Sequence, residues 1–130
     1  MRAVDTNVVV RLFAEDDAQQ VRAARQALAA DTVFIPKSVI VEFEWVMRGA
    51  YRESRAVIAS AIETILATAN VEVEDAAAVT RAVDWFRRGM DFADAVHLAS
   101  SGHADGFLTF DAAMRRRAKT SGATPIVVAP

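Results

Sequence analysis

Four acidic residues in widely separated segments have the type and placing to hold divalent metal ions: Asp5, Glu42, Asp94 and Asp111. Asp5 ends one short apolar run, and Asp111 directly follows another. The carboxyl ends of adjacent parallel strands meet at one edge of a sheet, so carboxylates placed there would come together. Such a cluster repels itself unless cations neutralise it, and oxygen ligands without His or Cys suit Mg²⁺ or Mn²⁺. These ions can activate a water for attack on a phosphodiester.

Each of these carboxylates also has a structural interpretation. Asp5 could be a turn residue, and Glu42 stands in an apolar stretch that predicts a helix. Asp111 could cap the helix that follows it, which does not exclude metal binding. Asp91 precedes Asp94 by three residues, so the two would be neighbours on a helix, with Asp91 well placed as its N-cap. We favour Asp94 as a ligand and keep Asp91 as a supporting candidate.

Other residues near these acids are expected to be structural. Glu44 would lie on nearly the opposite side of its helix from Glu42, at the surface. Trp45, in the same segment, is interpreted as a core residue. His97 follows Asp94 by three residues and could reach the site, although a histidine packed on the helix face is the favoured interpretation.

Short apolar runs alternate with helical patterns along the chain. Strands are predicted at 3–4, 32–35, 70–73, 106–110 and 125–128. Helices are predicted at 8–13, 16–30, 39–48, 53–67, 76–88, 92–103 and 112–119. Because the strands are apolar throughout rather than alternating, we expect a mainly parallel sheet flanked by helices, as in a three-layer α/β sandwich.

Caps and helical periods refine these elements. Asn7 is expected to cap the helix after the first strand, and Ser38 the helix after the second. Phe43 and Met47 fall on the predicted buried stripe of that second helix, and Val57 on the buried stripe of the next one.

The bulk properties limit the classes of protein. The 130 residues fit one domain, 1–130, and the absence of cysteine excludes disulfides and thiolate metal sites. The formal net charge of −2 decides nothing about nucleic acid, because bound metal ions can supply local positive charge. The N-terminal residues lack the apolar core of a signal peptide, and no apolar run approaches the roughly 20 residues of a membrane span. We therefore expect a cytoplasmic protein without membrane contact.

Four segments, taken together, carry a family resemblance: VDTNVVVRLF at 4–13, VEFEWVMRGAY at 41–51, DFADAVHLA at 91–99 and LTFD at 108–111. They stand in the order and at the spacing found in PIN-domain ribonucleases. The chain resembles in particular the VapC-type toxins of bacterial toxin–antitoxin pairs, and the resemblance covers essentially all of it.

The resemblance implies a PIN-like fold and an endoribonuclease that hydrolyses RNA with a metal-activated water. It places one or two Mg²⁺ or Mn²⁺ ions chiefly on three aspartates, with the glutamate ligating a metal or orienting water. The family's metal-ligand positions correspond to Asp5, Glu42, Asp94 and Asp111. The positions that match supporting polar or acidic residues are Asn7, Thr109 and Asp91.

Partners follow from the same resemblance and from one basic run. The run Arg115, Arg116, Arg117 comes shortly after Asp111 and could grip RNA phosphates, but a solvated helix face explains it equally well. Members of the family usually pair with a small antitoxin and often form homodimers, so a cognate antitoxin and a homodimer are expected here.

Three other classes compete with this interpretation. A phosphoacceptor receiver domain also has an acidic pocket at a sheet edge, but it needs a lysine at a later strand end, and neither Lys37 nor Lys119 is so placed. The same fold could serve as a catalytically silent RNA- or protein-binding scaffold, which the presence of all four carboxylates disfavours. A DNA-directed nuclease is disfavoured by the small size. The RNA target, the number of metal ions and the choice between Mg²⁺ and Mn²⁺ are not predicted.

Overall fold

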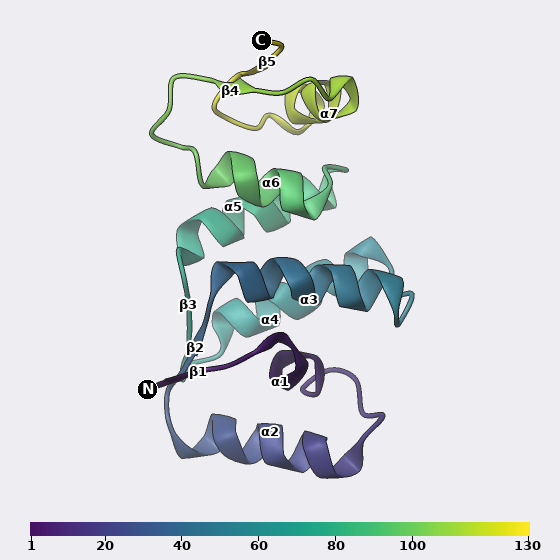
Figure 1. Ribbon diagram of the computed structural model, residues 1–130, viewed down its shortest axis with the longest axis vertical. Coiled ribbons are helices and arrows are strands. Elements are labelled where there is room, and N and C mark those ends of the chain that lie inside the picture. The colour runs from purple at the N-terminus through teal and green to yellow at the C-terminus, as the bar shows by residue number, and fades with distance from the viewer. The chain divides into compact units, whose positions relative to one another are not determined.

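The computed structural model describes all residues, Met1–Pro130. The chain divides into two compact units, a first unit of Met1–Ala76 and a second unit of Ala77–Pro130. Figure 1 follows the elements along the chain. None of the helices is long and apolar enough to cross a membrane.

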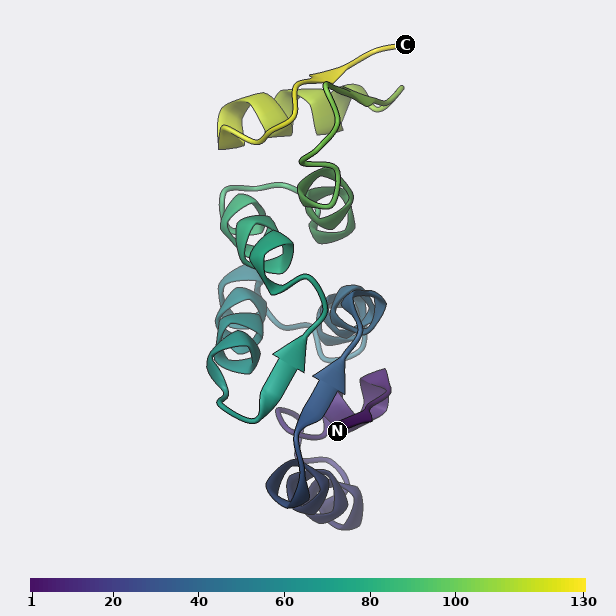
Figure 2. The same ribbon diagram turned by 90° about the vertical axis from the view of Figure 1, so that its left-hand side faces the viewer.

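The first unit is built around a small parallel sheet. Its elements are β1 (Arg2–Ala3), α1 (Thr6–Val10), α2 (Ala18–Ala30), β2 (Val33–Ile35), α3 (Lys37–Gly49), α4 (Arg55–Ala67) and β3 (Val71–Val73). The strand order is β1-β2-β3, with Ala3 opposite Phe34 and Ile35 opposite Val73. Figure 2 shows β2 and β3 side by side and running the same way. Asp5 therefore follows the carboxyl end of an outer strand.

The core of the first unit lies where helices cover this sheet. Val33 and Ile35 of β2 are buried and line a small apolar space with residues of α1 and α2. Helix α4 packs against β3 and α3. Phe13, after α1, packs against Phe43 of α3 with ring centroids 5.5 Å apart. These contacts fix α1 and α3 next to one another, which matters for the site.

The second unit carries its own pair of strands. Its elements are α5 (Ala76–Arg87, beginning at the boundary), α6 (Phe92–Ala99), β4 (Phe107–Leu108), α7 (Ala112–Ser121) and β5 (Val127–Val128). Strands β4 and β5 pair in parallel, with Phe107 opposite Val127. Phe86 meets Phe92 edge to face in the core, with centroids 5.3 Å apart. Gly89, at φ +114°, allows the tight connection between α5 and α6.

The predicted fold class is confirmed, with one difference in the sheet. The structure has helices packed on short parallel strands, as an α/β sandwich requires. The strands form two small sheets, one of three strands and one of two, instead of a single sheet. Element boundaries agree with the predicted ones to within a few residues, except that α6 ends at Ala99.

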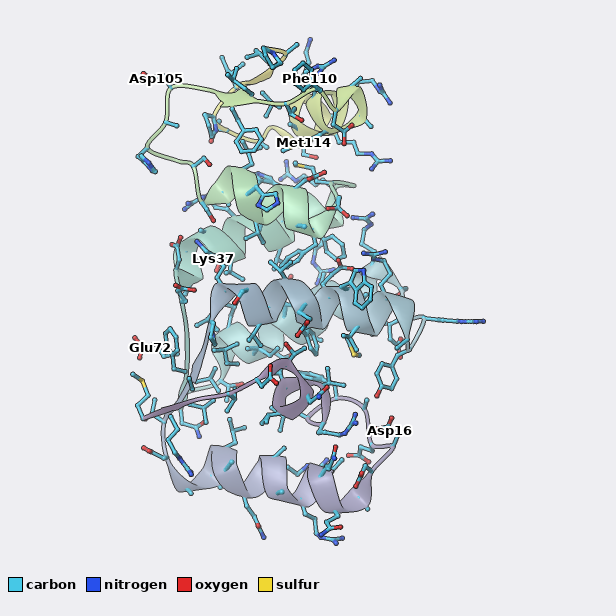
Figure 3. All side chains as sticks on the ribbon, in the orientation of Figure 1. Asp16, Lys37, Glu72, Asp105, Phe110 and Met114 are labelled. Atoms are coloured by element: carbon cyan, nitrogen blue, oxygen red, sulfur yellow. The ribbon has the colours of Figure 1, made fainter.

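Two predicted caps are wrong because a neighbouring residue takes the position. Helix α1 begins one residue before Asn7, and Asp5 caps it by accepting a hydrogen bond from the Thr6 N–H. Helix α3 begins at Lys37, labelled in Figure 3, directly after a proline whose fixed φ suits a helix start. The Lys37 N–H donates instead to Glu74 Oε1 at 2.8 Å, so Ser38 is not needed as a cap.

Burial differs from prediction at three helix positions. Glu44 is 3% exposed, whereas Trp45 is 64% and Val57 48% exposed. Glu44 falls on the buried stripe of α3, four residues after Ile40 and three before Met47, and its charge is matched by Arg48 at 2.8 Å. Trp45, the next residue, is turned about 100° away from this stripe and faces out.

Candidate active site

In the first unit, Thr6 bonds to two of the predicted carboxylates. The Asp5 carboxylate accepts a hydrogen bond from the Thr6 N–H at 2.7 Å. The Thr6 hydroxyl donates to Glu42 Oε1, although the two residues are 36 positions apart. Asp5 and Glu42 are exposed, while Thr6 is 3% exposed. The packing of α1 on α3 thus lets the buried Thr6 link the two carboxylates, Asp5 through its N–H and Glu42 through its hydroxyl.

Thr6 is the residue that sequence reasoning missed. It stands in the DTN segment between Asp5 and Asn7, and polar side chains there were considered only as caps or supports. The sequence feature that could have identified Thr6 is its position at the start of an apolar helix. A threonine buried there needs a hydrogen-bond partner for its hydroxyl. Asn7 is exposed, and its side chain bonds to neither carboxylate.

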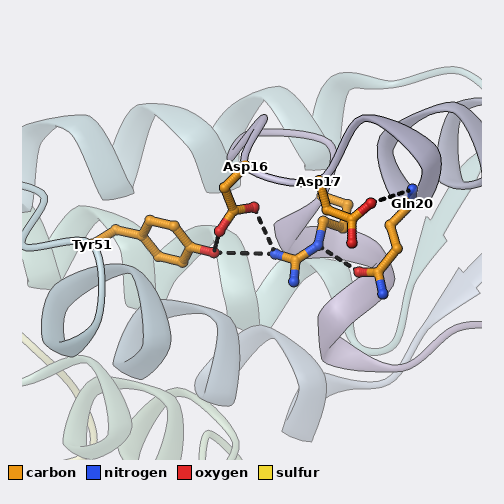
Figure 4. Close-up of polar contacts among 5 residues, drawn as sticks. Asp16, Asp17, Gln20 and Tyr51 are labelled. Carbon is orange, nitrogen blue, oxygen red and sulfur yellow. Dashed lines mark hydrogen bonds and ion pairs between the residues drawn. The ribbon is translucent and has the colours of Figure 1, made fainter.

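A polar network fixes the segment after α1. Arg11 donates from Nε to Gln20 Oε1 at 2.7 Å and from Nη1 to the Tyr51 hydroxyl at 3.1 Å, and it pairs with Asp16 at 3.1 Å. The Tyr51 hydroxyl donates to Asp16 at 2.8 Å (Figure 4). Asp17 completes the network by capping α2 through the Gln20 N–H. The Tyr51 bond and the Arg11 charge lower the pKa of Asp16. The Arg11 side chain is therefore held in place by Gln20, Tyr51 and Asp16.

In the second unit, Asp94 lies near two other aspartates, Asp91 and Asp111. Asp91 caps α6 by accepting from the Asp94 N–H at 3.1 Å, as its structural interpretation predicted. Burial raises the pKa of Asp94, and the charges of Asp91 and Asp111 raise it further, against smaller effects of His97 and Arg117. His97 is exposed and not packed, so that prediction is wrong. The ionised form of Asp94 is therefore disfavoured in this environment.

Asp111 is held by backbone and side-chain bonds at the start of α7. Its carboxylate accepts from the Met114 N–H at 3.1 Å, which makes it the N-cap. Its own N–H donates to the Thr109 hydroxyl at 3.0 Å. Arg115 donates to the Thr109 carbonyl at 2.8 Å. Of the basic run, Arg115 is half-buried, whereas Arg116 and Arg117 are exposed.

The chemical type of the candidate ligand side chains suits a hard divalent cation. All are carboxylates, and a bound cation would favour the ionised form of Asp94, whose pKa is raised first by burial and then by Asp91 and Asp111. Within neither unit do three or more His, Cys, Asp or Glu side chains form a group that could hold a metal ion. The first unit holds the pair of carboxylates around Thr6, and the second holds Asp91 and Asp111 near Asp94.

Helices on short parallel strands, with acids after β1 and β4, define an α/β protein whose acidic residues stand at strand ends, where ligands bind in such folds. The PIN-domain family model matches residues 2–120, and the chain therefore belongs to the PIN-domain family. The matched segment runs through both units. PIN domains are generally metal-dependent nucleases, which supports nuclease activity for this chain. The search against curated proteins returned no match.

Proposed function

We propose that this protein is an endoribonuclease that depends on Mg²⁺ or Mn²⁺, and that it is the toxin of a VapBC-type toxin–antitoxin pair. The observation that carries the proposal is the presence of all four acidic residues of the family motif in a chain that the PIN-domain model matches from residue 2 to residue 120. The proposal includes one nuclease domain over 1–130, a cytoplasmic location, a cognate antitoxin and a homodimer.

The proposed roles of the residues follow from their chemistry. A bound divalent cation would supply a water of lowered pKa as nucleophile and would offset negative charge on the phosphate. The residues proposed to hold it are Asp5, Asp94 and Asp111, with Glu42 either ligating it or orienting the water. Thr6 would position Glu42 through its hydroxyl, since a carboxylate bonded by a buried donor keeps one rotamer.

The supporting residues have separate tasks in this proposal. Asp91 and Thr109 hold the backbone of Asp94 and Asp111 through the bonds described above. Asn7 is retained as a supporting residue on the strength of the motif. The basic run Arg115–Arg117 on α7 would contact RNA phosphates, because guanidinium groups pair with phosphate oxygens in a bidentate way.

The test is cleavage of total cellular RNA by the purified protein, free of any co-purified antitoxin, with Mg²⁺ or Mn²⁺ and with EDTA. Asp94→Asn is the test variant, and Asp84→Asn on α5 is the matched control, because Asp84 is exposed and pairs only with Arg88, directly after the end of that helix. We expect discrete fragments from the wild type and the control, and none with EDTA or from Asp94→Asn. Equal cleavage by both variants would refute the assignment.

A second candidate is a scaffold of the same fold that binds RNA or a protein without cleaving. The observation that favours it is that neither unit alone gathers three metal-binding side chains. The same assay separates the two candidates, since a scaffold leaves the RNA intact under every metal condition.

A further inference from the structure

The short segment Thr109–Asp111 connects β4 to α7 and is fixed on both sides. The Thr109 N–H donates to the Val128 carbonyl at 3.0 Å, and the Thr109 carbonyl accepts from Arg115 at 2.8 Å. The Asp111 N–H donates to the Thr109 hydroxyl, and the Asp111 carboxylate caps α7. Phe110 lies between these two anchored residues. Its backbone is therefore held in place.

Phe110 presents its ring to solvent from this fixed segment. It is 87% exposed, the highest value among the large apolar side chains of the chain. In Figure 3 Phe110 lies above the start of α7 and Met114 below it, and Met114 is 5% exposed. The first turn of α7 is thus anchored in the core by Met114, while Phe110 contributes almost nothing to that core. The ring is thus carried by an anchored backbone and is open to a ligand.

The surface beside Phe110 is strongly basic. Arg115, Arg116 and Lys119 line a groove of about 610 Å³ together with the apolar residues Ile126 and Val127. Helix α7 contains four cationic residues and no acidic one. Arg116 and Lys119 have no carboxylate partner, so their charges remain available for an anionic ligand. The Arg115 guanidinium lies against the Thr109 carbonyl and so joins the groove to the segment that carries Phe110.

We propose that Phe110 stacks on an unpaired base of the RNA substrate while the cations of α7 bind the neighbouring phosphates. This inference rests on the proposed function, and it adds a substrate-binding residue directly beside Asp111. Aromatic stacking together with a basic track is the combination that binds single-stranded nucleic acid with little dependence on sequence. A base inside a duplex offers no free face, so the substrate is unpaired where Phe110 binds it.

The exposed ring of Phe110 together with the cations of α7 favours RNA over a protein as the occupant, because a nucleic acid offers both bases and phosphates. Other apolar side chains nearby are exposed, namely Leu108 at 64% and Ile126 at 71%. A protein partner that covered an apolar face would depend on Leu108 and Ile126 as much as on Phe110. A nucleic acid would depend on the ring of Phe110 and on the cations, because only the ring can stack on a base. The two occupants therefore predict different patterns of substitution effects.

The test measures binding of a short fluorescein-labelled single-stranded RNA by fluorescence anisotropy in EDTA, where cleavage is suppressed. We expect Phe110→Ala and Phe110→Leu to weaken binding by about tenfold, within the range given by the loss of one stacked base. Phe110→Trp should bind as well as the wild type or better. The matched control Leu108→Ala should stay within about twofold, because the Leu108 side chain cannot stack on a base. A duplex of the same sequence should bind more weakly, with no effect of Phe110→Ala.

Several outcomes would overturn the inference. Unchanged binding by Phe110→Ala would do so, as would an equal loss in Leu108→Ala, since a leucine cannot stack on a base. Restoration of binding by Leu would also contradict stacking. Because the assay needs no catalysis, its result is separate from that of the nuclease test. Cleavage without an effect of Phe110 refutes only the inference, and Phe110-dependent binding without cleavage refutes only the nuclease.

Discussion

Replacing Asp94 by asparagine should stabilise the folded protein at neutral pH. The Asp94 side chain is half-buried and faces the charges of Asp91 and Asp111. Asparagine keeps the shape of the side chain and removes its charge. The hydrogen bond that caps α6 uses the backbone N–H of residue 94, so the cap survives the substitution.

The pH dependence of this effect follows from the direction of the pKa shift. The pKa of Asp94 is raised above its ordinary value of 3.8, first by burial and then by its acidic neighbours. Between the unfolded and folded pKa the native state therefore holds more protons than the unfolded state, and wild-type stability falls as pH rises through this window. The variant lacks this loss. The gain in stability of the variant over the wild type is absent below the unfolded-state pKa of Asp94 and complete above its folded-state pKa.

The size of the stabilisation is limited by solvent screening around a partly exposed group. We expect a gain on the order of 0.5 kcal/mol in the free energy of unfolding at pH 7. For a domain of this length the corresponding rise in Tm is about 1–4 °C. The assay is urea or thermal unfolding followed by circular dichroism, at pH 7 and at the lowest pH where the protein stays folded. A variant that is less stable at pH 7, or a gain that does not change with pH, would refute the reasoning.

Three further predictions concern other residues. Thr6→Val leaves Glu42 without the buried hydroxyl that donates to it, so this substitution should cost about 1 kcal/mol of stability and slow RNA cleavage. Urea unfolding and cleavage rates check this, and Thr6→Ser should restore both stability and rate. Neutralising Arg115–Arg117 with glutamine should weaken RNA binding and reduce the salt slope of log K by about 2; an unchanged slope would make these ordinary surface residues. Tyr51→Phe removes the main hydrogen bond to Asp16, so the pKa of Asp16 should rise toward 3.8 in an NMR titration, and an unmoved pKa would contradict the network.

Much of the local structure could be predicted from residue patterns because helices and strands have fixed periods. The stripe of α3 illustrates both the strength and the limit of this reasoning. Phe43 and Met47 are buried as predicted, whereas Glu44 is predicted at the surface because it lies nearly opposite Glu42 on the helix. The position of Glu44 on the buried stripe outweighs its charge, since Arg48 pairs with it within the same helix. Trp45 is the reverse case, a large apolar side chain that the helical period turns outward.

Strand pairing and caps were harder to predict because they depend on competition between alternatives. The apolar residues of β4 suit any parallel neighbour, and the structure pairs them with β5. Asp5 and Asn7 are both good cap residues, and the choice between them is set by where the chain leaves β1. Such choices are made by packing over the whole unit, which a local pattern does not contain.

The candidate site could be predicted in its residue types but not in its connections. The acids Asp5, Glu42, Asp94 and Asp111 stand out through their placing and through the PIN-domain motifs. The link from Thr6 to Glu42 spans 36 positions and follows only from the packing of α1 on α3. The exposure of Phe110 could not be predicted either, because a phenylalanine after an apolar strand is normally expected to be buried.

The most direct test of the central claim is the rate of RNA cleavage as a function of Mn²⁺ concentration for single carboxylate variants. Asp5→Asn represents the first unit, Asp94→Asn the second, and Asp84→Asn is the control. We predict a loss of about 100-fold or more in each of the first two at every Mn²⁺ concentration, as expected when a group that acts on the transition state is removed, and a wild-type rate in the control. A wild-type, metal-dependent rate in either Asp5→Asn or Asp94→Asn would contradict the account.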